Sequence, residues 1–194
     1  MRSLIIETIL VLLATFIIYL FEPQASQVLA YYHTGIVQFE LWRLITATFC
    51  HTNFNHLLMN IAGLVITLLL FIDTFKTVNI LPIIIFNSVF IGIALFLFEP
   101  NVIWYVGLSG VLHGLFMYGA ANDINKNDPW GYLLGVGVTI KIAYEQFYGA
   151  QQATIELINA PVLVDAHLYG AIAGLLFYGI AWLLKKEKGS KSYL

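Results

Sequence analysis

Ser109 is the residue around which the chemistry of this sequence can be organised. It stands in the stretch Tyr105-Val-Gly-Leu-Ser-Gly-Val-Leu-His-Gly114, between Gly107 and Gly110. The glycines allow a sharp turn and the close approach of another part of the chain. A helix that begins near Ser109 would direct its free N–H groups at the space beside the hydroxyl. This arrangement suits a nucleophile with an oxyanion site, although a serine that only caps a membrane helix would use the same residue types.

Two further polar clusters lie in otherwise apolar stretches. His56 and Asn60 are four residues apart, so both project from one face of a helix. His167 follows Asp165 near the start of the last apolar stretch. A serine hydroxyl needs a base, usually His, to become a nucleophile, and the oxyanion that it generates needs hydrogen-bond donors. We therefore predict Ser109 as nucleophile and His167 as base, with His56, Asn60 and the Ser109 N–H holding the oxyanion.

Small residues predict how the base reaches the nucleophile. Gly110 and Gly114 follow the serine, and Gly170 and Gly174 follow the histidine, each pair with three residues between its members. Helices that meet through such faces approach closely. The alternative is that these polar groups only form hydrogen bonds between helices. That explanation suits any one of them better than it suits all of them at the same depth in the membrane.

The composition defines the class of protein. Hydrophobic residues make up 60% of the 194 residues and charged residues 10%, far below the roughly 25% of soluble domains, so the chain is an integral membrane protein. A net charge of −2 argues against nucleic acid as a partner. Cys50 is the only cysteine, which excludes an internal disulfide. His51, His56, His113 and His167 could bind a metal, but no carboxylate shares a face with a His pair, so neither metal nor cofactor is expected.

The apolar stretches predict an all-α protein with one membrane domain, 1–194, and six spans. The expected spans are residues 3–21, 53–71, 78–98, 109–121, 130–148 and 161–184. The fourth span carries the serine and, with roughly 13 residues or ~20 Å, is shorter than the ~30 Å hydrocarbon core. We therefore predict a water-filled pocket beside Ser109, with walls that include His56, Asn60, His113 and His167.

Other features complete the predicted organisation. Glu7 interrupts the first apolar stretch, which favours an uncleaved helix over a signal peptide. Residues 22–50 are rich in aromatic side chains and are expected to lie in the membrane interface. Lys141 and Glu145, four residues apart in the fifth span, are predicted to form a structural ion pair. Residues 149–160 are predicted to be a loop.

The basic residues predict the orientation of the chain. With six spans both ends share a side, and that side holds Arg2, Lys76, Lys126, Lys185, Lys186, Lys188 and Lys191. The opposite side holds Arg43 alone. The positive-inside rule therefore places both termini in the cytoplasm and Ser109 at the outer end of its span.

Four motifs resemble those of the rhomboid intramembrane serine proteases. They are Gly107-Leu-Ser109-Gly110, His56-x-x-x-Asn60, Trp42-Arg43, and Ala166-His167 with Gly170 and Gly174. The resemblance implies a six-helix rhomboid-like bundle, a Ser–His dyad without a third acid, and cleavage of membrane-anchored proteins near the membrane surface. It also implies a structural role for the Trp-Arg pair in the first outer loop.

Two stretches are similar to the rhombosortases, a compact bacterial subgroup: 108–115 and 42–51. This finer resemblance implies the bacterial inner membrane and substrates with a C-terminal Gly-Gly-containing motif, an apolar helix and a basic end. His113 stands where better-studied rhomboids often carry Tyr. The resemblance therefore implies that a second imidazole stacks on His167, and His113, four residues from Ser109, could also assist as base.

The sequence thus predicts a serine endopeptidase that cuts single-span membrane-anchored proteins near the outer interface, within the lipid bilayer and without a cofactor. Two other classes stay open. One is a catalytically silent rhomboid-like protein that binds transmembrane clients, against which the intact Ser–His pair argues. The other is a transporter or proton pathway built on the histidines and the Lys141–Glu145 pair. The sequence does not define the oligomeric state.

Overall fold

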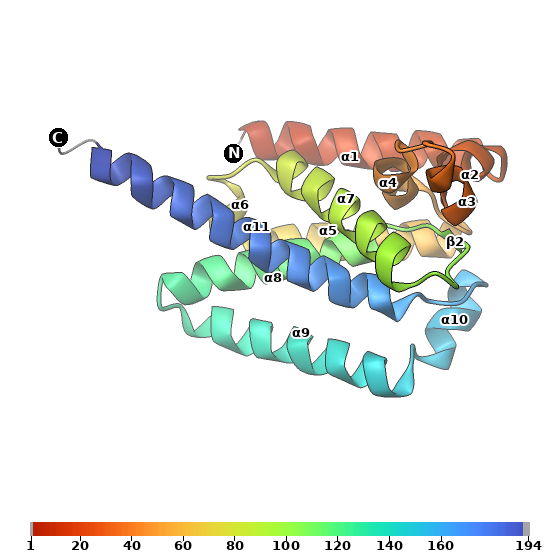
Figure 1. Cartoon of the computed structure of the whole chain (residues 1–194). Helices are drawn as coiled ribbons and strands as arrows, with labels where there is room; N and C mark the ends of the chain where they lie inside the picture. Colours follow the sequence, from red (N-terminus) through yellow and green to blue (C-terminus); the bar gives the residue numbers. More distant parts are fainter. Residues whose placement is uncertain (1, 192–194) are drawn as a thin grey trace.

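The computed structural model describes residues 2–191, and the side chains of residues 3–187. This part of the chain is a helical bundle (Figure 1). Its helices of 17 or more residues are α1 (Arg2–Leu20), α5 (Phe54–Leu70), α7 (Ile80–Phe98), α8 (Ser109–Asn125), α9 (Pro129–Tyr148) and α11 (Val164–Lys191). The start of α1 and the end of α11 lie at the end of the bundle that also holds the turn between α8 and α9, and α10 lies at the other end (Figure 1).

Three helical segments of the described chain are long and apolar enough to cross a membrane: Ser3–Leu20, Ile80–Phe98 and Val164–Glu187. A fourth is reached when Arg43–Phe49 and Phe54–Leu70, which meet at 96°, are counted as one broken span. α8 and α9 fall outside this criterion, and because α8 has 17 residues, as many as α5, the short fourth helix stays a prediction. The fold is therefore a helical membrane bundle, and the count of six spans stays a prediction.

Two helices run further than the sequence predicts. α8 continues to Asn125 instead of ending at 121, because polar residues in its last turns find partners on α6 (Ile72–Phe75). The Thr74 hydroxyl donates to Asp123 at 3.0 Å and accepts from the Asn122 amide at 2.6 Å. α11 continues past 184 to Lys191, and the first residues of this extension, Lys185, Lys186, Glu187 and Lys188, are good helix formers.

The segment 22–50, expected to lie at the interface, folds into short elements: α2 (Gln24–Leu29), β1 (Tyr31–Tyr32), α3 (His33–Val37), α4 (Arg43–Thr46) and the 3₁₀ helix η1 (Ala47–Phe49). β1 pairs antiparallel with β2 (Trp104–Tyr105), with Tyr31 opposite Tyr105, a two-residue pairing that the sequence did not predict in this mostly helical fold. The pairing satisfies backbone groups of two irregular segments, which apolar surroundings would otherwise leave unpaired. The predicted loop 149–160 is also corrected, because it contains α10 (Gln152–Ile158).

Trp42 and Arg43 hold the first connection together. The Arg43 guanidinium, only 7% exposed, donates to the Ala30 carbonyl at 2.8 Å and the Gln27 carbonyl at 3.1 Å. The Trp42 indole donates to the Val28 carbonyl at 3.0 Å. A planar guanidinium with several N–H donors can bind several backbone carbonyl groups of an irregular segment at once. These contacts give the Trp-Arg pair a structural part in the fold.

Glu7, which interrupts the first apolar stretch, has a partner in another helix. Its carboxylate accepts from the backbone N–H groups of Ile80 at 2.6 Å and Leu81 at 3.2 Å. These are the first residues of α7, whose N–H groups have no partner inside the helix. A negative charge also suits the positive end of the helix dipole. Glu7 therefore fastens α1 to the start of α7.

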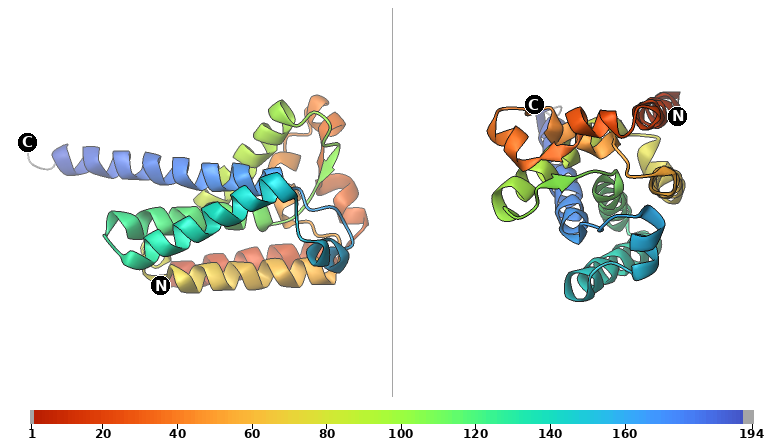
Figure 2. Two further views of the ribbon diagram at one scale, coloured as in Figure 1. Left: turned by 90° about the horizontal axis from the view of Figure 1, so that it is seen from below. Right: turned by 90° about the vertical axis from the view of Figure 1, so that its right-hand side faces the viewer.

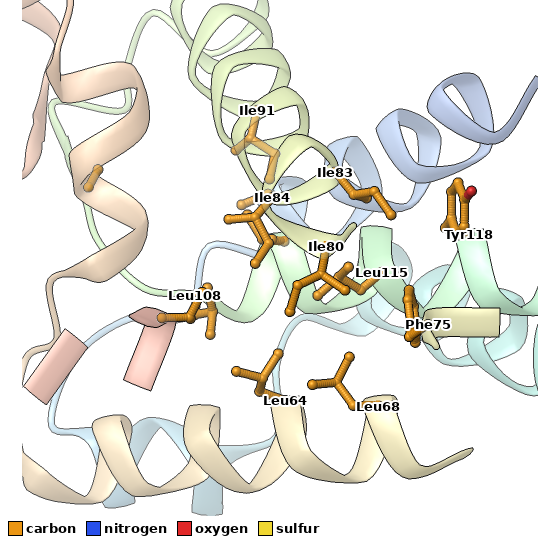
Figure 3. Close-up of a cluster of buried hydrophobic side chains, with 14 of the residues drawn as sticks. Leu64, Leu68, Phe75, Ile80, Ile83, Ile84, Ile91, Leu108, Leu115 and Tyr118 are labelled. Carbon is orange, nitrogen blue, oxygen red and sulfur yellow. The ribbon is translucent and has the colours of Figure 1, made fainter. Parts of the chain in front are cut away.

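α8 occupies the middle of the bundle. It contacts α5, α7, α9 and α11, and the end-on view shows the other long helices arranged around it (Figure 2). Figure 3 shows the apolar core between these helices. Its buried side chains include Leu64, Leu68, Ile80, Ile83, Ile84, Leu108 and Leu115.

The closest helix contact joins α8 to α11 through the predicted glycine faces. A β-carbon at Gly170 would overlap the carbonyl oxygen of Gly110, and one at Gly174 would overlap that of Gly114. The two backbones are therefore in direct contact, as the small-residue pattern predicts. This contact fixes the distance between the first turns of the two helices, where Ser109 and His167 stand.

Gly170→Ala should lower the stability of the protein because the added methyl forces α8 and α11 apart. Overpacking of this kind costs about 1–3 kcal/mol. Gly179→Ala on the same helix is the matched control, since its β-carbon meets no described atom within 4 Å. It should be neutral or stabilising by up to about 1 kcal/mol through helix propensity. Thermal unfolding in detergent measures both, and equal melting temperatures would contradict the contact.

Candidate active site

Ser109 is the first residue of α8, and its hydroxyl faces the base predicted from the sequence. Leu108 is the residue that caps the helix, without a side-chain hydrogen bond, so Ser109 does not serve as the cap. The Ser109 Oγ lies 3.0 Å from Nε2 of His167, which stands in the first turn of α11. The structure therefore brings the predicted nucleophile and base to hydrogen-bond distance.

The turn before Ser109 depends on Gly107, whose φ of +121° is one that other residues rarely adopt. A β-carbon at this position would lie 2.8 Å from Nε2 of His56. The Gly107 N–H donates to the Ala47 carbonyl at 3.1 Å, and the Tyr105 hydroxyl donates to the Gly107 carbonyl at 3.1 Å. Burial raises the pKa of the Tyr105 hydroxyl, which therefore stays a neutral donor.

His56 and Asn60 of α5 converge on the space beside Gly107. The Nδ1 atom of His56 lies 3.4 Å from the backbone nitrogen of Thr52, and in the tautomer that accepts this N–H the proton on Nε2 faces Gly107. Asn60 is 4% exposed, and its amide nitrogen has no hydrogen-bond partner among the described residues. The amide lies 3.8 Å from the β-carbon position of Gly107. Two donors are thus directed at the backbone just before Ser109.

The His113 ring stacks on the His167 ring, with centroids 4.2 Å apart and planes at 19°. Its Nδ1 lies 2.8 Å from the Ser109 carbonyl, which can only accept, so Nδ1 carries the proton. Its Nε2 then accepts from the Lys141 ammonium at 2.8 Å. Both nitrogens of His113 are therefore engaged, whereas Nε2 of His167 is the nitrogen that faces the serine hydroxyl.

Lys141 and Glu145 form the predicted ion pair, with 2.8 Å between Nζ and Oε2, but the pair is also part of the site. Glu145 Oε2 also lies 2.9 Å from Nδ1 of His167, so the pair contacts the predicted base, and its structural role stays a prediction. The sequence did not identify this contact, because 22 residues separate Glu145 and His167 and nothing local fixes how α9 meets α11. The available signal was a carboxylate in a membrane span, which is normally functional.

A cavity of about 550 Å³ contains these groups. Its polar lining includes Thr52, His56, Asn60, Ser109, His113, Lys141, Glu145 and His167, which confirms the walls predicted from the sequence. α10 forms one border through Thr154 and Ile158. The Thr52 hydroxyl donates to the Ile158 carbonyl at 2.8 Å, and this bond joins α10 to the residues that precede α5. The cavity is large enough for an extended peptide segment of a few residues.

His113, Glu145 and His167 could also hold a metal ion, since their ligand atoms lie within 4.8 Å of one another. The sequence spacing, which places no carboxylate on one helix face with a His pair, did not reveal this group, because its three residues lie on three different helices. The Lys141 ammonium stands among these groups, 2.8 Å from His113 and Glu145 and 3.5 Å from His167. It occupies the place of a metal ion and supplies the positive charge. The absence of a metal stays a prediction.

Lys141→Ala should turn this cluster into a metal site. Removing the ammonium frees three ligand atoms and abolishes the repulsion between two cations. Zn²⁺ should bind at least about tenfold tighter than to the wild type, which corresponds to about 1.4 kcal/mol. Isothermal titration calorimetry in detergent measures the affinity. Lys126→Ala, at the turn after α8, is the control, and unchanged zinc affinity in Lys141→Ala would contradict the assignment of the ammonium to this position.

The fold and the site define a multi-pass integral membrane protein with a serine and a histidine paired in a cavity. The chain belongs to the rhomboid family, since the model of the Rhomboid domain matches residues 38–184. The chain is similar to the chloroplastic rhomboid-like protein 11 of Arabidopsis thaliana, with 29% identity over 175 residues. The alignment covers 86% of this chain and 59% of that protein, so the chain spans less than two thirds of its relative.

A second relative is YdcA of Bacillus subtilis (strain 168), which is provisionally named a rhomboid protease. The two chains are 25% identical over 157 residues, which cover 81% of this chain and 75% of YdcA. The match to the Rhomboid domain, residues 38–184, contains all of the residues that line the cavity. Membership of the family is thus established over the part of the chain that carries the site.

Proposed function

We propose that this protein is a rhomboid-type intramembrane serine endopeptidase that cleaves single-span membrane-anchored proteins near the outer membrane interface. The observation that carries the proposal is the 3.0 Å contact between Ser109 Oγ and His167 Nε2 beside two buried donors. Membership of the rhomboid family and the provisional name of the Bacillus relative support it. Cleavage by such a site needs no cofactor.

The arrangement suits acyl transfer. Ser109 Oγ attacks the carbonyl carbon of the substrate as its proton moves to Nε2 of His167. The negative charge that develops on the carbonyl oxygen is stabilised by the Asn60 amide, the His56 imidazole and the Ser109 N–H. The proton then moves from Nε2 to the leaving nitrogen as the C–N bond breaks. In the second half of the reaction, water gives a proton to Nε2 and attacks the acyl-enzyme, and Nε2 returns the proton to Ser109 as the ester bond breaks.

The surroundings of the buried Asn60 amide favour a catalytic role for this residue over a role in packing alone. A buried donor without a partner costs about 1–3 kcal/mol, so a residue that serves only the fold would be expected to have one. Its nitrogen has no partner among the described residues and borders the cavity. The cost is offset when the oxyanion of a substrate accepts a hydrogen bond from this amide, as expected of a site that binds the transition state.

The finer assignment is a rhombosortase of the bacterial inner membrane that removes C-terminal Gly-Gly-type sorting signals. A Gly-rich segment of the substrate would unwind readily and let its backbone come close to the walls of a narrow site. Both termini are cytoplasmic in this assignment. The chain end and the turns that carry Lys76 and Lys126 lie at the opposite end of the bundle from α10 (Figure 1), which is consistent with that orientation.

Covalent labelling of Ser109 by a fluorophosphonate in native membranes tests the proposal. The wild type should be labelled, and it should cleave a single-span reporter that carries a Gly-Gly motif, an apolar helix and a basic end. Ser109→Ala and His167→Ala should each abolish cleavage, and the double variant should be no worse, because the two residues act as a unit. Ser26→Ala, outside the cavity, is the control.

Full cleavage in Ser109→Ala membranes would exclude the protease. A rhomboid-like protein that only binds clients would retain the reporter without cutting it, and a transporter would do neither. Residual cleavage in His167→Ala that disappears when His113→Ala is added would transfer the role of base to His113.

Asn60→Ala and His56→Ala should each lower kcat by about 10²–10³-fold, the usual effect of removing one oxyanion donor. KM for the reporter and the melting temperature should change little, because these donors act only as charge develops. Asn125→Ala, an exposed amide at the end of α8, is the matched control. Loss of folding in either variant, with no effect on kcat in the folded fraction, would assign these residues to packing instead.

A further inference from the structure

The contact between Glu145 and His167 is not needed for a two-residue mechanism. Glu145 Oε2 lies 2.9 Å from Nδ1 of His167, the nitrogen on the opposite side of the ring from the serine. The Glu145 side chain is 12% exposed and that of His167 6%. A carboxylate buried this far in a membrane bundle is costly to keep unless it is paired and hydrogen-bonded.

The geometry requires one particular tautomer of His167. Nε2 must be unprotonated to take the proton of Ser109, so a neutral imidazole must carry its proton on Nδ1. An ionised carboxylate can only accept a hydrogen bond. A carboxylate at Nδ1 therefore selects the tautomer that can act as base, and it stabilises the imidazolium that forms when the proton arrives.

Lys141 fixes the orientation of Glu145. Its ammonium lies 2.8 Å from the same oxygen that contacts His167, and it also donates to Nε2 of His113 at 2.8 Å. His113 in turn stacks on the His167 ring. The imidazole is thus held on one face by His113, at one nitrogen by Glu145 and at the other by Ser109. These contacts come from α8 and α9, while the ring itself belongs to α11.

We propose that Glu145 is a positioning residue that completes a Ser109–His167–Glu145 arrangement, with Lys141 as its support. The inference rests on the proposed function and departs from the Ser–His dyad without a third acid that the family resemblance implies. As Oγ attacks, the Oγ–H bond breaks and the proton binds Nε2. The Nδ1 proton stays on His167, and Glu145 remains a carboxylate that faces the positive ring. Nε2 then gives its proton to the leaving nitrogen as the C–N bond breaks.

Glu145→Gln tests the inference with nearly unchanged shape. The amide can donate to Nδ1, which would place the imidazole proton on Nε2 and block its use as base. We expect kcat for the reporter and the rate of fluorophosphonate labelling to fall about 10²–10⁴-fold, as the loss of a triad acid does elsewhere. KM and the melting temperature should stay close to wild type. Glu156→Gln on α10, whose carboxylate contacts only Gln152 among the described side chains, is the matched control.

Two further variants separate positioning from packing. Glu145→Asp keeps the charge and should recover part of the lost kcat, whereas a residue needed only for shape would gain nothing from it. Lys141→Met should lower kcat less than Glu145→Gln does, because the contact between Glu145 and His167 remains. A kcat for Glu145→Gln within threefold of wild type would overturn the inference, as would a loss that merely follows the unfolded fraction.

A measurement on the wild type keeps the inference falsifiable if Glu145→Gln does not fold. NMR of the protein with ¹⁵N-labelled histidines in detergent reports which ring nitrogen carries the proton, and His167→Gln identifies the signal of His167. We expect the proton on Nδ1, strongly hydrogen-bonded, and Nε2 free. A proton on Nε2 would overturn the inference. Wild type that never reacts with fluorophosphonate would instead refute the proposed function itself, so the two failures are distinguishable.

Discussion

The direct backbone contact between α8 and α11 is the constraint on which the rest of the structure depends. Because Gly170 and Gly174 carry no side chain, their helix lies against the carbonyl groups of Gly110 and Gly114. The serine precedes one glycine pair and the histidine precedes the other, so the packing of the helices sets the distance between two reacting atoms. A larger residue at the contact would separate them without touching either. The stability of the bundle and the distance between Ser109 and His167 therefore depend on the same few glycines.

Several polar groups elsewhere in the bundle join two elements. Glu7 binds the start of α7, Arg43 binds carbonyl groups of the first connection, and Thr74 binds the end of α8. In apolar surroundings a hydrogen bond stabilises the fold more than in water, and a buried polar group without a partner destabilises it. The side chains of Tyr31, His51, Asn60 and Asn87 each leave one buried polar atom without a partner among the described residues, and of these four side chains that of Asn60 lines the cavity.

The helices, the glycine contact and the residues around Ser109 could be predicted because each depends on a local pattern. Apolar length gives the helix positions, glycine spacing gives the close approach, and a spacing of four places His56 and Asn60 on one face. Glu145 could not be placed in the same way, because its contact depends on how α9 crosses α11. The β1–β2 pairing and the seven residues of α10 were also missed, since both form through tertiary contacts and have weak local signals.

The bond between Glu7 and the start of α7 has a consequence for the order of assembly. Glu7 and Ile80 are 73 residues apart, and a ribosome that adds about 5–20 residues per second needs roughly 4–15 s to make that stretch. During this interval α1 presents a carboxylate to the membrane before its partner has been synthesised. The first helix therefore enters the bilayer as an incomplete unit and reaches its final environment only when the third long helix arrives. The final placement of α1 in the membrane thus depends on α7, which is synthesised several seconds later.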